Sequence, residues 1–213
     1  APGHRIGFVG LGNMGRPMAE RLAGAGFRLT LCDARPGVAE AAAPGTVVID
    51  FSTIAAPATR EFARRLADRR LEMLDCPVSG GAMGAQAATL SIMVGGEAAT
   101  LERARPLLEK LGRTIVHIGP SGSGQVVKAC NQIVTGMGVA AVAEAFNFAR
   151  KSGADVAKVR EALMGGFAYS KILENHGQRM IDRNFKPGFK AWMHQKDLRI
   201  VMEEAHRLGL MLP

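Results

Sequence analysis

The stretch RIGFVGLGNMGRP (residues 5–17) joins a short apolar strand to the start of a helix through spaced glycines. In this Gly-x-Gly-x-x-Gly pattern the first glycine permits a tight turn, the second lets the backbone approach a pyrophosphate, and the third permits close packing of helix on strand. The helix N-terminus then offers N–H groups to the phosphates. The pattern predicts a dinucleotide site made by Gly10, Leu11, Gly12, Asn13, Met14 and Gly15.

Asp33 follows the next strand-like run, at 28–32, and bears on the choice of cofactor. A carboxylate there can accept hydrogen bonds from the ribose hydroxyls of NAD and would repel the additional phosphate of NADP. Arg35 can still reach that phosphate, and an aspartate that only starts a turn is the structural alternative. We therefore expect NAD or NADP as cofactor, with NAD favoured by Asp33.

The rest of the N-terminal half alternates strand-like and helix-like runs. Strand-like runs lie at 5–9, 28–32, 46–49, 71–75, 90–94 and 114–118, and helix-like runs at 16–23, 57–69 and 98–111. Such alternation indicates α/β layering with a largely parallel sheet. After the glycine-rich stretch 119–124 every run is helix-like. We expect a dinucleotide-binding Rossmann domain over 1–119 and an all-α substrate and dimerisation domain over 120–213.

The link between Asp33 and Thr46 is anomalous. Only 12 residues lie between them, including Pro36, Gly37, Pro44 and Gly45, whereas a crossover between parallel strands needs a dozen or more residues and usually a helix. Either the sheet is minimal at this place or a segment is absent from the chain.

Composition restricts the classes of function. The 213 residues carry a net charge of +8, but the basic residues are scattered along helix-like runs without aromatic platforms, which argues against nucleic-acid binding. The three cysteines lie far apart, as is typical of a reducing cytoplasm. The histidines are dispersed, so we expect no metal. The most apolar stretch, 133–143, is too short to span a bilayer, so we expect no membrane partner.

The run 125–150 predicts one long helix, apolar on nearly all sides, which favours a homodimer or homotetramer. Its polar side chains Lys128, Asn131, Gln132 and Thr135 follow helical spacing and share one face. Partial burial lowers the pKa of a lysine toward neutrality, where proton transfer is efficient. A lysine beside two carboxamides fits a site that protonates a substrate oxygen, although a hydrated interface is also possible.

The strand-like run 71–75 leads into a second candidate site, Ser79-Gly80-Gly81. Two glycines after a strand free backbone N–H groups to form an anion-binding nest, and a serine hydroxyl beside them can bind a carboxylate. A flexible turn is the alternative. Lys196 and Asp197 begin a later helix-like run and, by themselves, are an ordinary solvated charge pair.

Together these motifs resemble the β-hydroxyacid dehydrogenase family, which includes 3-hydroxyisobutyrate dehydrogenase and is related to 6-phosphogluconate dehydrogenase. The matching stretches are GFVGLGNMGRPMA (7–19), DCPVSGG (75–81), GPSGSGQVVKACNQ (119–132) and KDL (196–198). The resemblance covers nearly the whole chain. It implies a Rossmann domain followed by an all-α domain, and an NAD(P)-dependent oxidoreductase acting on a small carboxylate-bearing aldehyde or hydroxyacid.

The resemblance also implies a role for each matching residue. Lys128 matches the catalytic lysine, and Ser79, Gly80 and Gly81 match the loop that holds the substrate carboxylate. Asn131 and Gln132 match substrate-binding carboxamides. Many members carry asparagine at the second of these positions, so which amide contacts substrate stays open. Further matches are the cofactor contacts Thr53 and Lys196, and the supporting residue Asp197.

The blocks 162–180 and 185–198 most resemble the branch that reduces 2-hydroxy-3-oxopropionate (tartronate semialdehyde) to glycerate. Alternatives are 3-hydroxyisobutyrate dehydrogenase, a reductase of glyoxylate or succinic semialdehyde, and a non-catalytic dinucleotide-binding interaction module. Family members carry a further β-α-β stretch where this chain has only 34–45, and they continue past the counterpart of Pro213.

Overall fold

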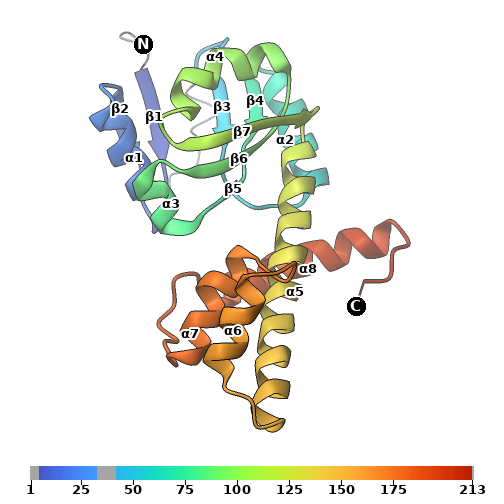
Figure 1. Cartoon of the computed structure of the whole chain (residues 1–213). Helices are drawn as coiled ribbons and strands as arrows, with labels where there is room; N and C mark the ends of the chain where they lie inside the picture. The colour runs from blue at the N-terminus through green and yellow to red at the C-terminus, as the bar shows by residue number, and fades with distance from the viewer. Residues whose placement is uncertain (1–4, 33–41, 213) are drawn as a thin grey trace. The chain divides into compact units, whose positions relative to one another are not determined.

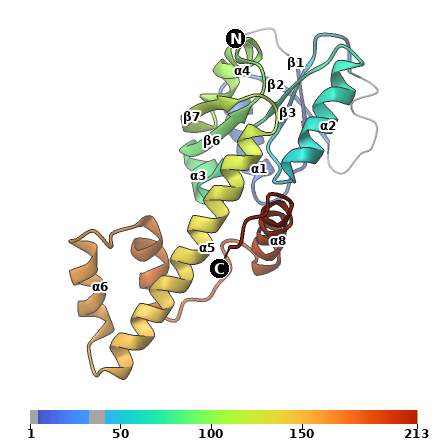
Figure 2. The ribbon, with the colours of Figure 1, turned by 90° about the vertical axis from the view of Figure 1, so that its right-hand side faces the viewer.

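The computed structural model describes residues 5–32 and 42–212 (Figures 1 and 2). The chain forms two compact units, one of residues 1–129 with 202–213 and one of residues 130–201. The division falls inside the helix α5 (Ser123–Lys151), later in the chain than the domain boundary predicted near residue 119.

Parallel strand pairs form the framework of the first unit. β1 (Arg5–Val9) pairs with β2 (Arg28–Cys32), and β3 (Val47–Asp50) pairs with β4 (Glu72–Asp75), both in parallel. The larger sheet has the order β3-β4-β6-β5, and β7 (Gly112–Gly119) lies parallel to β6 (Leu90–Gly95). β6 runs antiparallel to β4 and to the short β5 (Val78–Ser79). The predicted α/β class is confirmed, with these antiparallel pairs as its exception.

Helices pack on the strands through apolar faces. α1 (Gly15–Gly24) contacts β2 and α3 (Gly81–Ala87), α2 (Ala56–Ala67) contacts β4, and α4 (Ala98–Leu108) contacts β4 and β7. Each large aliphatic side chain buried in this core contributes about 1.5–3 kcal/mol. Fully buried members are Met18, Leu22, Leu74, Leu90, Ile92, Leu101, Leu108 and Leu111.

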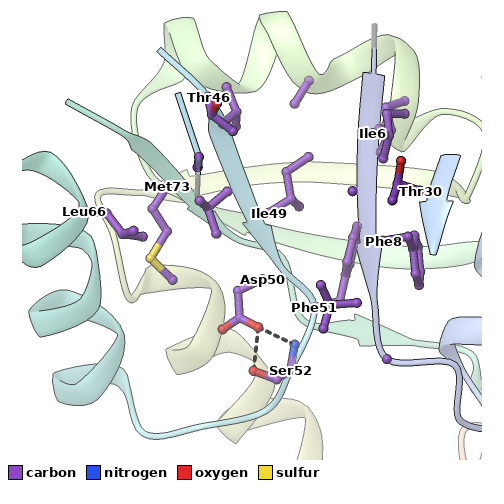
Figure 3. A pocket seen from close by; sticks show the side chains of 18 of the residues that line it. Ile6, Phe8, Thr30, Thr46, Ile49, Asp50, Phe51, Ser52, Leu66 and Met73 are labelled. Atoms are coloured by element: carbon purple, nitrogen blue, oxygen red, sulfur yellow. Dashed lines mark hydrogen bonds between the residues drawn. The ribbon is translucent and has the colours of Figure 1, made fainter. Parts of the chain in front are cut away.

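A gap separates the two sheets. Among the described residues, β1 pairs only with β2 and β3 only with β4. A space of about 1970 Å³ is lined by residues of both strands. Figure 3 shows Ile6 and Phe8 of β1 on one side of it and Ile49 of β3 on the other, with the two strands running in the same direction. In the usual Rossmann order 3-2-1-4-5-6, one further parallel strand stands at this place.

The second unit is helical, as predicted. It contains the later part of α5, α6 (Val156–Met164), a π-helical turn η1 (Leu173–Gly177), α7 (Gln178–Ile181) and most of α8 (Ala191–Arg207). Asp155 caps α6 by accepting a hydrogen bond from the N–H of Ala157 at 2.9 Å. Phe146 of α5 is buried against Leu173 and Gly177 of η1. This packing fixes the later part of α5 on the helices that follow it.

α5 is longer and more continuously apolar than the stretch 133–143 suggested. An 18-residue window in it has a mean hydropathy of 1.4, so by length and composition alone the helix is able to cross a membrane. The helix is therefore longer than the apolar stretch considered in the sequence analysis, and the core helix of a soluble protein passes the same test. Val134, Met137 and Phe148 are 71%, 48% and 75% exposed in the single chain. A helix that is apolar on all sides is covered either by protein or by lipid.

Candidate active site

Glycines shape the loop between β1 and α1. Gly10 has a φ of 91°, which side chains other than glycine rarely adopt. A Cβ at Gly15 would lie 1.8 Å from the carbonyl oxygen of Gly10, so only glycine allows this approach of helix to strand. A Cβ at Gly12 would meet nothing within 4 Å, which leaves the loop open on that side. The cradle thus fits a pyrophosphate lying against the start of α1.

The backbone forms this cradle. Leu11 and Met14 turn inward and pack against the hydrophobic core, while Asn13 is exposed. No side-chain cap occupies the start of α1 at Met14 within the described structure. Asp33, predicted to bind the ribose, lies outside the described residues.

Lys128 lies in the second turn of α5 and is only 9% exposed. Its Nζ donates a hydrogen bond of 2.8 Å to the carbonyl oxygen of Val78, the residue directly before Ser79. Gly80 and Gly81 follow with φ values of 132° and 62°. The structure therefore brings the lysine against the loop predicted to hold a carboxylate.

Asp75, which the sequence analysis did not single out, anchors the start of α5. It is 1% exposed, and its carboxylate accepts the N–H groups of Gly122 at 2.8 Å and Gln125 at 3.0 Å. A carboxylate at this end of a helix satisfies unpaired N–H groups and lies at the positive end of the helix dipole. Because Lys128 follows within the next turn, Asp75 also fixes the place of the lysine.

Gln125 is a second residue that sequence reasoning missed. It is 3% exposed, donates from Nε2 to the carbonyl oxygen of Ser52 at 2.9 Å and accepts at Oε1 from the N–H of Ile54 at 3.2 Å. These bonds hold the backbone on both sides of Thr53, the predicted cofactor contact. The sequence feature that could have identified Gln125 is its position directly after the glycine-rich stretch.

Asp75→Ala is expected to lower the free energy of unfolding by about 3 kcal/mol, because it leaves two buried N–H groups without an acceptor. Urea unfolding measures this loss. Asp155→Ala is the matched control, since Asp155 also accepts an N–H at a helix start but from an exposed position; it should cost about 1 kcal/mol. Equal losses in the two variants would contradict the anchoring role.

In the second unit, predicted residues of α5 and α8 form one polar cluster. Gln132 is 4% exposed; its Nε2 donates to Oδ2 of Asp197 at 2.6 Å, and its Oε1 accepts from Nδ2 of Asn131 at 2.8 Å. Nζ of Lys196 lies 2.6 Å from Oδ1 of Asp197. Nδ1 of His194 lies 3.4 Å from Nε2 of Gln132. His194 was missed, although its helical spacing from Asp197 was a usable signal.

Cys76 is buried at the end of β4. Burial, with the negative charges of Asp75 and Asp50, raises the pKa of its thiol far above the ordinary range. The thiol therefore stays protonated and is a poor nucleophile at neutral pH. Within residues 5–32 and 42–212, no group of three or more His, Cys, Asp or Glu side chains is placed to hold a metal ion.

Known proteins match both halves of the chain. A family model for the NAD binding domain of 6-phosphogluconate dehydrogenase matches residues 5–37 and 31–119. A model for the NAD-binding domain of NADP-dependent 3-hydroxyisobutyrate dehydrogenase matches residues 122–213. The chain belongs to the 3-hydroxyisobutyrate dehydrogenase family. This membership supports β-hydroxyacid dehydrogenase activity with NAD or NADP as cofactor.

Individual members of the 3-hydroxyisobutyrate dehydrogenase family are similar over nearly the full chain. The 2-hydroxy-3-oxopropionate reductase of Escherichia coli is 41% identical over 253 residues, covering 98% of this chain and 87% of the relative. The 3-hydroxyisobutyrate dehydrogenase of Pseudomonas aeruginosa is 34% identical, with coverages of 98% and 87%. The structure of Mycobacterium tuberculosis 3-hydroxyisobutyrate dehydrogenase with L-serine has a TM-score of 0.89 at 32% identity, with coverages of 98% and 89%.

These matches also bear on the gap between the sheets. The alignment to the Escherichia coli protein spans 253 residues, more than the 213 of this chain, so that relative carries residues without a counterpart here. The first family model matches in two pieces that meet at residues 31–37, between β2 and β3. The break in the family-model match thus falls in the link between β2 and β3, the same link that precedes the gap between the sheets.

Proposed function

We propose that this protein reduces 2-hydroxy-3-oxopropionate to glycerate, with Lys128 as the proton donor. The observation that carries the proposal is the hydrogen bond from Nζ of Lys128 to Val78, which holds a nearly buried ammonium group beside Ser79. Similarity to the Escherichia coli 2-hydroxy-3-oxopropionate reductase, at 41% identity, supports the choice of substrate.

The proposed roles follow from the chemistry of each group. The backbone of Gly10–Gly15 would hold the pyrophosphate of NAD(P)H, which when bound supplies a hydride to the aldehyde carbon. Ser79, Gly80 and Gly81 bind the substrate carboxylate and so orient the aldehyde. Lys128 keeps one N–H on Val78 and directs another at the aldehyde oxygen. The C=O bond becomes a C–O–H group, with its proton from Nζ, and the ammonium charge stabilises the developing alkoxide.

The proposal is tested by following oxidation of NADH and of NADPH with four aldehydes in parallel. We expect 2-hydroxy-3-oxopropionate to be turned over faster than glyoxylate, succinic semialdehyde and methylmalonate semialdehyde, with NADH preferred because of Asp33. A preference for methylmalonate semialdehyde would instead make the protein a 3-hydroxyisobutyrate dehydrogenase. Nucleotide binding without turnover of any aldehyde would favour a non-catalytic module.

We also propose that the protein is a cytoplasmic homodimer or homotetramer. The exposed side chains Val134, Met137 and Phe148 on α5 support this, because a second copy would cover them. The free thiols of Cys76 and Cys130 suit a reducing compartment. Light scattering of the purified protein gives the oligomer size, and a monodisperse monomer without detergent would contradict the proposal.

A further inference from the structure

A small pocket lies within the second unit, lined by the end of α5 and by residues of α6 and α7 (Figure 1). Its volume is about 270 Å³, which is space for about nine non-hydrogen atoms at roughly 30 Å³ each. Most of its lining is apolar, and these side chains are Phe146, Val156, Met180, Ile181 and Phe185. The pocket is thus able to hold the apolar body of a small molecule.

The polar part of the lining is positively charged. Arg150 comes from the last turn of α5 and Arg183 from the chain after α7, and Asn147 is the other polar residue. Among the described residues, no acidic side chain lines the pocket, and neither guanidinium forms an ion pair with a carboxylate. Two such positive charges at one pocket repel each other, and a bound anion relieves this repulsion. The charge of the pocket therefore favours an anionic ligand.

An aromatic ring holds Arg183 at the pocket. The guanidinium carbon of Arg183 lies 5.7 Å from the centre of the Phe185 ring. The ring attracts the positive charge but offers no oxygen to the N–H groups of the guanidinium. These N–H groups are therefore available to a ligand, and their planar arrangement matches the two oxygens of a carboxylate.

The backbone of Arg183 adopts a conformation that favours glycine. Its φ is 52°, and the N–H groups of Arg183 and Asn184 donate to the carbonyl oxygens of Met180 and Arg179. Glycine occupies the same position at the end of α5, where Gly153 has a φ of 79°. A residue with a Cβ destabilises the fold in this conformation. Arginine is thus held at position 183 at the expense of stability, as is typical of residues that serve a site.

We propose that this pocket binds a monocarboxylate with a compact apolar body, and that Arg150 and Arg183 hold its carboxylate group. The apolar body lies against Phe146, Met180 and Ile181. The ligand differs in chemistry from 2-hydroxy-3-oxopropionate, whose polar groups would not cover these side chains. None of the residues assigned to substrate or cofactor lines the pocket, so the inference goes beyond the proposed function and does not rest on it.

Benzoate is the probe, because it has the size that the pocket admits and is ionised at neutral pH. The methyl groups of Met180 and Ile181, followed by NMR, report on binding in the pocket itself. We expect benzoate to shift both signals with a Kd of about 1 mM or lower, and benzyl alcohol, which lacks the charge, to bind about tenfold more weakly. The methyl group of Met83, on α3 beside Gly81, reports separately on binding at the loop assigned to the substrate carboxylate. Unshifted signals of Met180 and Ile181, or equal affinity for benzyl alcohol, would overturn the proposal.

Two substitutions test the arginines. Arg183→Gly is expected to weaken benzoate binding about tenfold and to raise Tm by about 2 °C, because it removes an anion contact and an unfavourable φ together. Arg150→Met keeps most of the side-chain length without the charge, and it should weaken binding about tenfold as well. Wild-type affinity in either variant would overturn the proposal. A lower Tm in Arg183→Gly would show that the arginine serves the fold, and would overturn its assignment to the ligand.

Arg70→Gly is the matched control. Arg70 has a φ of 57° in the same pattern at the end of α2, and it does not line the pocket. This variant should raise Tm as Arg183→Gly does, and it should bind benzoate with unchanged affinity. An equal loss of affinity in Arg70→Gly would make the effect one of net charge and would overturn the proposal.

A dilution series without benzoate tests whether a second copy of the chain covers the pocket instead. We expect the methyl signals of Met180 and Ile181 to stay in place as the protein concentration changes. Signals that shift with concentration, and that benzoate no longer moves at high concentration, would assign the pocket to a contact between copies and would overturn the proposal.

Discussion

Lys128→Met is expected to lower turnover of the aldehyde substrate by about three orders of magnitude, because it removes both the proton donor and the positive charge that faces the developing alkoxide. Methionine keeps most of the length and volume of the side chain, so the packing around this nearly buried position should survive. Affinity for NADH, measured by fluorescence titration, should change less than twofold, roughly, since the glycine cradle lies on β1 and α1.

The matched control is Lys151→Met, at the opposite end of the same helix, where the lysine is exposed. We expect this variant to retain full turnover. That result would show that the loss of a lysine from α5 does not by itself inactivate the protein. If Lys128→Met kept a tenth or more of the wild-type rate, roughly, the proton would have to come from another group. The pH profile of the remaining activity would then identify that group.

Local patterns were enough to predict the glycine cradle and the face of α5. The constraints on Gly10 and Gly15 act within one turn, and Lys128 and Asn131 are related by the period of a single helix. The anchoring of α5 could not be read in the same way. Asp75 lies 47 and 50 residues from the N–H groups it accepts, and no periodicity joins positions so far apart.

The orientation of the amides also needed the structure. The sequence showed Asn131 and Gln132 as neighbours on a helix, which left open which of them meets substrate. Asp197, which accepts a hydrogen bond from Gln132, lies 65 residues away on α8, so no local pattern predicts this pairing. Similarly, residue spacing left open whether the link after β2 is a minimal crossover or lacks a segment. Only the strand pairings of residues 5–32 and 42–212 showed that β1 and β3 each have an edge without a partner among those residues.

Inserting a strand–helix–strand segment between β2 and β3 is expected to stabilise the first unit. The segment would follow the further β-α-β stretch that the family resemblance implies at this place, where the first family model also matches in two pieces. A parallel strand in the 1970 Å³ space would pair the backbone groups of β1 and β3 and pack against the partly buried Ile6 and Ile49. We expect Tm to rise by about 5 °C or more.

The same insertion should tighten NADH binding about tenfold or more, or by roughly 1.4 kcal/mol. The reason is that β1 ends in the glycine cradle, and a strand paired on its free side would restrain the loop that approaches the pyrophosphate. An insertion of equal length made of Gly and Ser is the control, because it lengthens the link without supplying a strand. If the Gly and Ser insertion raised Tm and NADH affinity equally, the greater length of the link, and not a new strand, would be the cause. If neither insertion changed them, the space between β1 and β3 would not be the place of a missing strand.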